Sequence, residues 1–390
     1  MRVTVIAPLK IPYDTKSGGR IHLLCKSLID KGIDVNVLIS KPTENKNNEG
    51  PIFIDGIKYF HPFQKSKRSR YFLKRQIDKF LFYIFIFVTV CFRFNKNDVI
   101  ILFPAFDFRL FIPLLTKISE ARVVLEINEY PLVQRKNTII TRIKRMLIFK
   151  LSFPVYDGFI VISDELKKII IKYKSSESII IKIPIIAKPV ERILNSKPPV
   201  PYPYLFHAGS LSENKDGVLG MIEGFGLAIR EIEKEVKFIF TGLAKKSVHY
   251  NEILDLIKKY NLQNQIIFTG FLSSEELDTY MRHSFLSIIN KKDTIQNKYC
   301  FASKLAEYLS YSIPVITTNI GESNNYLTDN KNAFLVETEN VNKLAEKIIE
   351  VFSDSQNRLF VSKNAKNLFD WHFEYSVYRN ELLTFLKHLN

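Results

Sequence analysis

Short apolar runs alternate with helical patterns along the first half of the chain. We expect strands over Val3–Ala7, Val35–Ile39, Val99–Phe103, Val123–Ile127 and Phe159–Ile162. Apolar residues at helical spacing lie between them, over residues 19–31, 71–94, 108–119 and 136–150. Because strands that alternate with helices are typical of βαβ units, we predict a parallel sheet covered by helices on both faces.

The second half repeats this pattern after a proline-rich interruption. Six prolines fall within residues 184–203, where they exclude a helix interior or a central strand. Further strands are expected over Tyr204–Ala208, Val236–Thr241, Ile266–Thr269, Phe285–Ile289, Pro314–Thr317 and Ala333–Val336, with helices over 218–232, 275–283, 303–311 and 340–352. A last helix is expected around Tyr375–Leu386, after the only tryptophan, Trp371.

These patterns divide the chain into domains. We predict a Rossmann-like domain over 1–185, a linker over 186–203, a second Rossmann-like domain over 204–370 and a closing helix over 371–390. Two such domains imply a cleft at the carboxyl ends of both sheets.

The most membrane-like stretch is 80–92, in which Thr89 is the only polar residue. A helix of these residues would reach about 20 Å, short of the roughly 30 Å of hydrocarbon in a bilayer. We therefore expect a buried helix, with membrane contact as the alternative. The opening apolar run, which Pro8 ends, is too short for a signal peptide and is expected to be a strand.

Charge is distributed unevenly in an otherwise ordinary globular composition. Of the 390 residues, 46% are apolar and 25% are charged, which excludes a mainly disordered chain. Residues 1–190 hold 33 Lys and Arg against 16 Asp and Glu, while the remainder holds 23 against 24. The first half should therefore meet an anionic partner: a membrane surface, a phosphate-bearing substrate or nucleic acid. A general bias towards lysine is the alternative.

Cysteine and histidine spacing argues against disulfides and zinc. Cys25, Cys91 and Cys300 are too few and too scattered for a disulfide framework, so a reducing compartment is expected. No Cys-x-x-Cys or His-Glu-x-x-His motif occurs, which makes a zinc site improbable.

Two regions carry candidate phosphate contacts. The loop Lys16–Arg20 contains paired glycines before a helix N-terminus, which favours an anion, although a tight turn would also need them. In the second half, Lys215 opens a helix soon after a strand ends at Gly209, and charge and helix dipole together suit a pyrophosphate.

A third motif is Phe301–Leu309. If Ser303 caps the helix here, its free N–H groups face the cleft, and Lys304 and Glu307 share one face. A lysine for phosphate and a carboxylate for two sugar hydroxyls suit a nucleotide site. The alternative is that Glu307 is a solvated helix residue.

In this order, these motifs resemble those of GT-B glycosyltransferases of family 4. The resemblance extends over nearly the whole chain and rests on four segments. They are the paired-glycine loop, Gly209 to Lys215, the Phe268–Ser273 run, and the Lys304–Glu307 helix before Ile313–Thr318. It implies two Rossmann-like domains facing across a cleft, with the C-terminal helix crossing back to the first. It also implies sugar transfer from a nucleotide sugar with retention and without a divalent metal or other cofactor, and no Asp-x-Asp triplet occurs.

The resemblance assigns roles residue by residue. Lys215 is similar to the family's pyrophosphate lysine and Glu307 to its ribose-binding glutamate. The implied donor-binding residues are Gly18, Gly19, Gly209, Ser210, Lys215, Gly270, Phe271, Tyr299, Ser303, Lys304 and Glu307. Two positions depart from the family pattern, because Ser210 stands where arginine is usual and Tyr299 where glutamate is usual.

In the first half, Glu129 follows a strand in the run Leu125–Pro131. Similar family members carry Arg-Asp-Leu-Trp-Pro there, so Glu129 would match an aspartate and accept a hydrogen bond from the acceptor hydroxyl or the transferred sugar. Pairing with a lysine is the alternative. Lys215, Glu307 and Glu129 are thus the candidate catalytic residues.

The sequence therefore predicts a metal-independent retaining hexosyltransferase that uses a UDP- or GDP-sugar. The acceptor would be a saccharide or a lipid-linked sugar, in bacterial cell-surface polysaccharide or glycolipid synthesis. The alternatives are a nucleotide-sugar epimerase of the same architecture and a basic protein that binds membrane or nucleic acid, although nucleic-acid motifs are absent from the sequence.

We also expect the first domain to dock on an anionic membrane, on the inner face of the cell membrane. Basic residues near apolar ones in 64–76 and 135–153 suggest this. The candidate residues are Lys65, Arg68, Arg70, Arg142, Lys144 and Arg145. Solvated cations on a helix packed against the sheet are the alternative.

Overall fold

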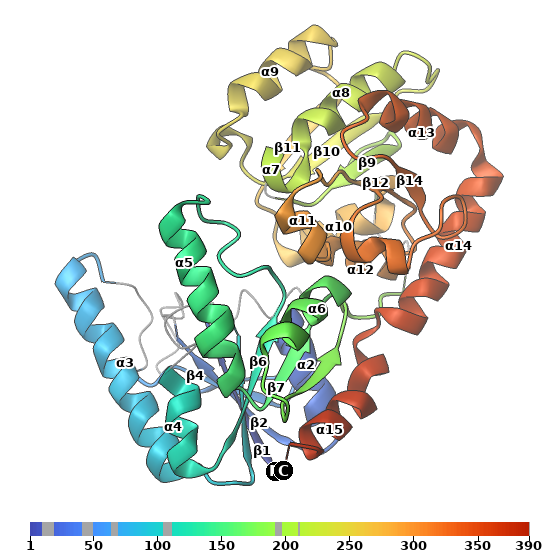
Figure 1. Ribbon diagram of the computed structural model, residues 1–390. Coiled ribbons are helices and arrows are strands. Elements are labelled where there is room, and N and C mark those ends of the chain that lie inside the picture. Colours follow the sequence, from blue (N-terminus) through green and yellow to red (C-terminus); the bar gives the residue numbers. More distant parts are fainter. Residues whose placement is uncertain are drawn as a thin grey trace. The chain divides into compact units, whose positions relative to one another are not determined.

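The computed structural model describes residues 1–9, 19–40, 50–63, 69–103, 111–191, 197–209 and 211–389. Gly18, Lys65, Arg68 and Ser210 lie outside these ranges. The chain divides into two compact units (Figure 1). The first comprises Met1–Pro184 and Tyr375–Asn390, and the second comprises Ile185–Glu374.

The described part of the first unit contains an eight-stranded sheet in the order β3-β4-β2-β1-β5-β6-β7-β8. Its strands are β1 (Arg2–Ala7), β2 (Asp34–Ile39), β3 (Ile52–Ile54), β4 (Ile57–Phe60), β5 (Asp98–Leu102), β6 (Arg122–Ile127), β7 (Gly158–Val161) and β8 (Ile179–Lys182). Neighbouring strands pair in parallel, except for the hairpin of β3 and β4. The predicted parallel sheet is therefore confirmed, with β3, β4 and β8 added.

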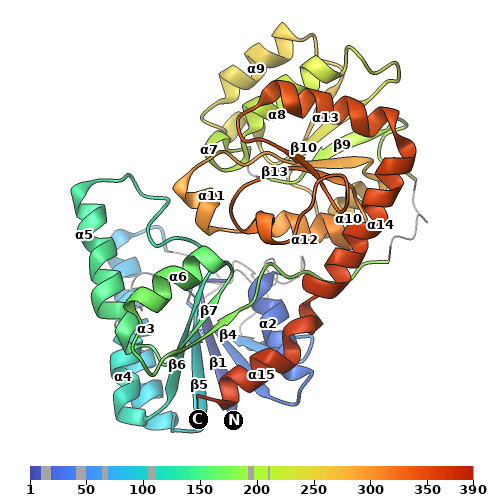
Figure 2. The same ribbon diagram turned by 45° about the vertical axis from the view of Figure 1, so that its right-hand side comes forward.

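Helices cover both faces of this sheet, as the buried strands require (Figures 1 and 2). They are α2 (Arg20–Ile29), α3 (Phe72–Arg93), α4 (Phe111–Ser119), α5 (Ile139–Leu147), α6 (Asp164–Tyr173) and α15 (Arg379–Lys387). A π-helical turn over Ile148–Ser152 and a 3₁₀ turn over Phe153–Val155 extend α5. Helix α15 packs close to β7, because a Cβ on Gly158 would lie 2.8 Å from the Phe385 ring.

The expectation that residues 80–92 form a buried helix is wrong. Only Phe82, Ile86 and Val90 of α3 are buried, whereas Phe80 and Phe92 are 65% and 77% exposed. The reason is that α3 packs through one face only, against α4 and the rings of His61 and Phe63 after β4. Among the described residues, no helix is both long and apolar enough to cross a bilayer.

In the second unit, a six-stranded parallel sheet has the order β11-β10-β9-β12-β13-β14 over the described residues. The strands are β9 (Tyr204–His207), β10 (Lys237–Thr241), β11 (Ile266–Gly270), β12 (Leu286–Ile289), β13 (Val315–Thr318) and β14 (Phe334–Val336). The boundaries of each strand lie within one or two residues of those predicted from the sequence. Two α/β units with parallel sheets thus confirm the predicted fold class.

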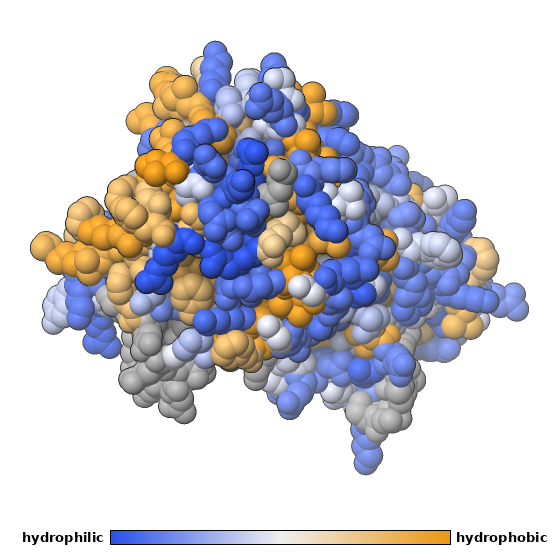
Figure 3. Space-filling model, turned by 90° about the horizontal axis from the view of Figure 1, so that it is seen from below, coloured by the Kyte–Doolittle hydropathy of each residue, from blue (hydrophilic) through white to orange (hydrophobic). Residues whose placement is uncertain are grey.

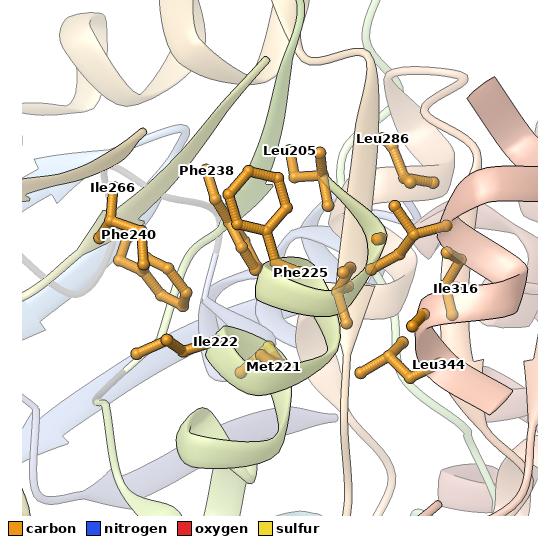
Figure 4. Packing of buried hydrophobic residues seen from close by; sticks show 14 of the residues in the cluster. Leu205, Met221, Ile222, Phe225, Phe238, Phe240, Ile266, Leu286, Ile316 and Leu344 are labelled. Atoms are coloured by element: carbon orange, nitrogen blue, oxygen red, sulfur yellow. The ribbon is translucent and has the colours of Figure 1, made fainter. Parts of the chain in front are cut away.

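Helices surround this second sheet. They are α7 (Glu213–Asp216), α8 (Val218–Ala228), α9 (Tyr250–Lys259), α10 (Ser274–His283), α11 (Ile295–Tyr299), α12 (Ser303–Ser310), α13 (Val341–Ser353) and α14 (Ser355–His372). Figure 4 shows Met221 and Phe225 of α8 packing on Leu205 and Phe238 of the strands, with Leu344 of α13 beside them. This core fixes the helices whose ends border the candidate site.

The closing helix begins later than the predicted residue 371. Trp371 belongs to α14, where it is 75% exposed, rather than to the closing helix. A 3₁₀ turn over Tyr375–Tyr378 then leads into α15, which contacts α2 in the first unit. The predicted return of the chain to the first unit is therefore confirmed, and it begins at Tyr375.

Candidate functional site

Three neighbouring strands of the second sheet end in glycine at one edge. Gly209 follows β9, Gly242 follows β10, and Gly270 ends β11. The φ angles of Gly242 and Gly270 are +91° and +74°, and the Gly242 N–H donates to the Gly270 carbonyl over 2.8 Å. A Cβ on Gly242 would lie 2.9 Å from the Gly209 carbonyl oxygen, so only glycine lets these backbones approach. The result is a closely packed stretch of main chain that is partly accessible at Gly209 and Gly270, where a ligand can approach it.

Lys215 lies at this same edge, in the single turn of α7. Ser212 caps the turn by accepting a hydrogen bond from the Lys215 N–H, and Gly217 ends it at a φ of +63°. A Cβ on Gly217 would lie 2.2 Å from the Asn290 carbonyl oxygen. Position 217 therefore requires glycine, which fixes the turn while the Lys215 side chain stays exposed.

Two further lysines adjoin this turn, and the sequence analysis missed them. Lys291 Nζ donates to the Lys215 carbonyl over 2.9 Å and lies 3.7 Å from Asp216 Oδ1. Lys292 Nζ lies 2.5 Å from Glu213 Oε1. Both lie within three residues of the end of β12, so their place at the carboxyl end of a predicted strand was a signal that could have identified them.

Helix α12 (Ser303–Ser310) begins at the same edge, but its N-cap residue differs from the predicted one. Ala302 is the N-cap and makes no side-chain hydrogen bond, whereas Ser303 is the first helical residue. Ser303 is therefore not the cap, since its backbone is already helical. The first N–H groups of α12 consequently have no capping side chain.

Lys304 and Glu307 form an ion pair on α12, with 2.6 Å between Nζ and Oε2. The Lys304 side chain is 34% exposed and the Glu307 side chain 25%. The Tyr308 hydroxyl accepts a hydrogen bond from the Ala208 N–H over 2.8 Å, which anchors α12 beside the end of β9. This contact brings the Lys304–Glu307 pair towards the glycine edge.

A small hollow adjoins the start of α12, lined by Lys291, Asn297, Cys300, Phe301 and Thr318 among others. Tyr299, at the end of α11, is half-buried beside it. On the far side of the edge, the Phe271 side chain after β11 is 74% exposed. The hollow therefore provides a small recess of mixed polar and apolar lining next to the uncapped helix end.

His207 lies buried under the glycine edge. Its Nδ1 is 3.1 Å from the Ile288 carbonyl oxygen, and its Nε2 would lie 2.2 Å from a Cβ placed on Gly209. Burial lowers the pKa of His207 below its ordinary value of 6.5, and Asp216 partly opposes this effect. A neutral imidazole thus supports the turn where β9 ends.

In the first unit, Gly19 is the N-cap of α2 and makes no side-chain cap hydrogen bond. The next residue, Arg20, reaches the fully buried Glu126 of β6, with 2.7 Å between Nε and Oε1. Arg20 also donates to the carbonyls of Ile183, over 2.7 Å, and Pro184. Burial raises the pKa of the Glu126 carboxyl, while the Arg20 charge acts in the opposite direction. The sequence analysis did not identify this pair.

Glu129 lies in the loop after β6, where it accepts a hydrogen bond from Gln134 Nε2 over 2.7 Å. The sequence analysis gave pairing with a lysine as the alternative role for Glu129, whereas the contact seen here is with the Gln134 amide. Arg145 of α5 steadies this loop, because its Nε donates to the Pro131 carbonyl over 2.9 Å and its guanidinium lies 4.7 Å from the centre of the Tyr130 ring. Arg145 is therefore engaged within the unit, while the exposed Arg142 donates from Nε to Asn137 Oδ1 over 3.3 Å and Lys144 is exposed.

The predicted donor residues of the second unit thus gather at the carboxyl edge of its sheet. They are Gly209, Lys215, Gly270, Phe271, Tyr299, Ser303, Lys304 and Glu307. Gly19 and Glu129 belong to the first unit, and Gly18 and Ser210 lie outside the described residues. Within the described ranges, no group of three or more His, Cys, Asp or Glu side chains is placed to hold a metal ion.

Sequence comparison identifies a matching family over the second unit and a curated relative of part of the chain. Residues 192–368 match the model of the family described as "Glycosyl transferases group 1". A curated relative, the uncharacterized glycosyltransferase MJ1178 of Methanocaldococcus jannaschii, is 30% identical over 148 residues. That match covers 37% of this chain and 39% of the relative's length.

Solved structures resemble the chain along its whole length. The sucrose-phosphate synthase of Thermosynechococcus elongatus has a TM-score of 0.72 at 16% identity, covering 100% of this chain and 99% of that one. A glycosyltransferase from Rickettsia africae has a TM-score of 0.68 at 16% identity, covering 100% and 98%. HepE of Anabaena, in complex with UDP and glucose, has a TM-score of 0.69 at 14% identity, covering 99% of each chain. At these identities the similarity concerns the fold.

Proposed function

We propose that this chain, whose residues 192–368 match the group 1 glycosyltransferases and which has the GT-B fold, moves a sugar from a UDP- or GDP-sugar to a saccharide or lipid-linked acceptor. The observation that carries the proposal is the carboxyl edge of the second sheet. The partly accessible main chain at Gly209 and Gly270, Lys215 and the Lys304–Glu307 pair at the start of α12 lie there. HepE, which shares the fold, was solved with UDP-glucose, and this supports a nucleotide-sugar donor.

We assign the donor to the second unit. The nucleotide base would contact the main chain at Gly270 and Phe271, and Glu307 would accept hydrogen bonds from two ribose hydroxyls. Lys215 and the uncapped N–H groups of α12 would face the diphosphate, because a cation and a helix N-terminus both favour an anion. Tyr299, Ser303 and Lys304 would border the phosphate and sugar.

The reaction proposed is retaining and needs no divalent metal. The bond from the anomeric carbon to the diphosphate oxygen breaks while the acceptor oxygen bonds to that carbon on the same face. Lys215 and the α12 N-terminus would stabilise the charge on the departing diphosphate. The departing phosphate oxygen would take the acceptor proton, so that the products are a glycoside and a nucleoside diphosphate.

We assign the acceptor to the first unit, where Glu129 would accept a hydrogen bond from the acceptor hydroxyl or the sugar. Its hydrogen bond with Gln134 and the Arg145 contacts give the loop one defined position. The excess of basic residues in 1–190 favours an acceptor at an anionic surface. We therefore infer a role in bacterial cell-surface polysaccharide or glycolipid synthesis, on the inner face of the cell membrane.

The proposal is tested by nucleotide binding and product analysis. Thermal shift with UDP, GDP and ADP should show stabilisation by UDP or GDP. Incubation with the matching nucleotide sugar and candidate acceptors should then release nucleoside diphosphate and form a glycoside detectable by mass spectrometry. Interconversion of nucleotide sugars without an acceptor would instead identify an epimerase and contradict the proposal.

A further inference from the structure

Helix α3 exposes an apolar stripe on the face opposite to the one that packs. The stripe comprises Leu73, Ile77, Phe80, Ile84 and Phe87, which are between 41% and 74% exposed. Steps of four, three, four and three residues place them on one side of a helix that turns about 100° per residue. The buried residues Phe82, Ile86 and Val90 fall on the other side.

The helices α4 and α5 extend this surface. Leu114 and Ile118 of α4 are 57% and 64% exposed, and Ile139, Ile140 and Ile143 of α5 are 76%, 64% and 51% exposed. Figures 1 and 2 show α3, α4 and α5 together on one side of the first sheet, and Figure 3 shows hydrophobic side chains gathered on the side of α3. We call the exposed apolar residues of these three helices the apolar face.

An apolar surface that extends over three helices is unusual on a monomeric protein. Such surfaces mark sites where another molecule binds, because leaving them in water forgoes the hydrophobic free energy of burial. In α3, the run 80–92 contains no charged residue, so nothing on that part of the stripe favours water.

The charge around the apolar face identifies the kind of partner. The helices α3, α4 and α5 together hold eight lysine and arginine residues and one acidic residue, Asp78. In α5, the exposed Arg142 and Lys144 flank Ile143. Long basic side chains can lie along an apolar surface and extend their charges beyond it.

We propose that the apolar face docks on an anionic lipid bilayer, with α3 and α5 lying in the plane of the interface. The apolar side chains would enter the region between headgroups and acyl chains, while the cations meet lipid phosphates. A second copy of this chain fits less well, because the same excess of positive charge would face itself. The inference rests on the proposed function in one respect: docking would bring the first unit to a lipid-linked acceptor.

Flotation with lipid vesicles tests this docking in the absence of nucleotide. The intact protein should bind vesicles of phosphatidylcholine mixed with phosphatidylglycerol, and bind at least tenfold less to phosphatidylcholine alone. Binding should weaken with salt, since the Debye length is only about 10 Å at 0.1 M.

Two multiple variants separate the apolar and charged contributions. Phe80→Ser/Ile84→Ser/Phe87→Ser and Arg142→Glu/Lys144→Glu should each reduce binding to anionic vesicles at least tenfold. The matched controls lie in the second unit, where Leu359→Ser/Phe360→Ser changes residues that are 66% and 55% exposed. Lys234→Glu/Lys363→Glu reverses two exposed charges there. Both controls should bind as the wild type does.

Insertion of α3 has a direct optical test. The only native tryptophan is Trp371, so Trp371→Phe/Phe80→Trp places a single indole on the apolar face. Its fluorescence should be quenched by lipids brominated on their acyl chains, whereas the wild-type fluorescence should not.

Three outcomes would overturn the docking proposal: binding by the apolar variant equal to that of wild type, no vesicle binding by the folded protein, or a soluble dimer that the apolar variant dissociates. Thermal shift with UDP and GDP on the same variants keeps docking distinct from catalysis. Vesicle binding without any nucleotide response would support docking and contradict the proposed donor site.

Discussion

Arg20 and Glu126 form a buried ion pair that joins three segments of the first unit. Arg20 is the first residue of α2, Glu126 lies in β6, and the same guanidinium binds the carbonyls of Ile183 and Pro184 where the first unit ends. The pair therefore fixes the start of α2, directly after the paired-glycine loop, to the strand that precedes Glu129. We regard Arg20 as a positioning residue.

Loss of Arg20 should destabilise the first unit strongly. Arg20→Ala would leave the Glu126 carboxylate buried without its counter-charge, and breaking such a pair costs about 3–5 kcal/mol. Urea denaturation followed by circular dichroism measures the change. Lys168→Ala, which breaks the exposed Lys168–Glu165 pair, is the control and should cost at most about 1 kcal/mol. Similar losses for both variants would show that the buried pair has no special role.

Lys215 should be needed for turnover but not for folding. Its side chain is exposed, so Lys215→Ala should leave the thermal midpoint nearly unchanged. Removing one preorganised charge from the leaving diphosphate should lower kcat by about 10²–10³-fold. Steady-state release of nucleoside diphosphate measures this, with the exposed Lys234→Ala as the control. A Lys215→Ala enzyme that retains more than a tenth of wild-type turnover would remove Lys215 from the mechanism.

Glu307 should contribute to nucleotide affinity even when no sugar is attached. Glu307→Gln replaces a charged acceptor of ribose hydrogen bonds, so nucleotide binding should weaken by about 1.5–3 kcal/mol in calorimetry. The Lys343–Glu346 pair of α13 has the same spacing and a similar distance of 2.7 Å. Glu346→Gln therefore controls for loss of a helical ion pair and should leave affinity unchanged. Equal affinities for the wild type and Glu307→Gln would make Glu307 a solvated helix residue.

His207 should make stability depend on pH in mildly acidic solution. Because burial lowers the pKa of His207 below 6.5, the unfolded chain takes up this proton at a higher pH than the folded chain does. The stabilisation is therefore present above pH 6.5 and is lost as the pH falls towards the folded-state pKa. His207→Gln removes the titration, so its free energy of unfolding should fall less steeply over this range. Parallel pH curves for the two proteins would contradict this prediction.

The strands were predictable because buried parallel strands form continuous apolar runs, such as Val99–Phe103. The orientation of α3 was not, since its apolar residues surround the helix and leave no polar face to indicate solvent. The short β3 and β4 lacked a clear run. Periodicity also failed to identify α14, whose buried residues Val361, Ala365 and Phe369 are four apart within a polar sequence.

Some contacts of the candidate site were likewise predictable from the sequence, and others were not. Lys304 and Glu307 share a helix, so their spacing predicted the contact that the structure shows. Arg20 and Glu126 are 106 positions apart, and only the folded sheet brings them together. The N-cap residue of α12 was also not predictable from the sequence. Whether the helix begins at Ser303 or one residue later depends on the backbone angles that the folded protein imposes there.

The return of the chain at Tyr375 makes the second unit an insertion within the first. Residues from Tyr375 onwards complete the first unit: Ser27 Oγ donates to the Tyr375 carbonyl over 3.1 Å, and Arg379 lies 3.0 Å from Asp30. A ribosome releases these residues only after the whole of the inserted unit. The inserted unit can therefore fold first, whereas the first unit, which begins earlier, must wait until the residues from Tyr375 onwards emerge before its surface against α2 is covered.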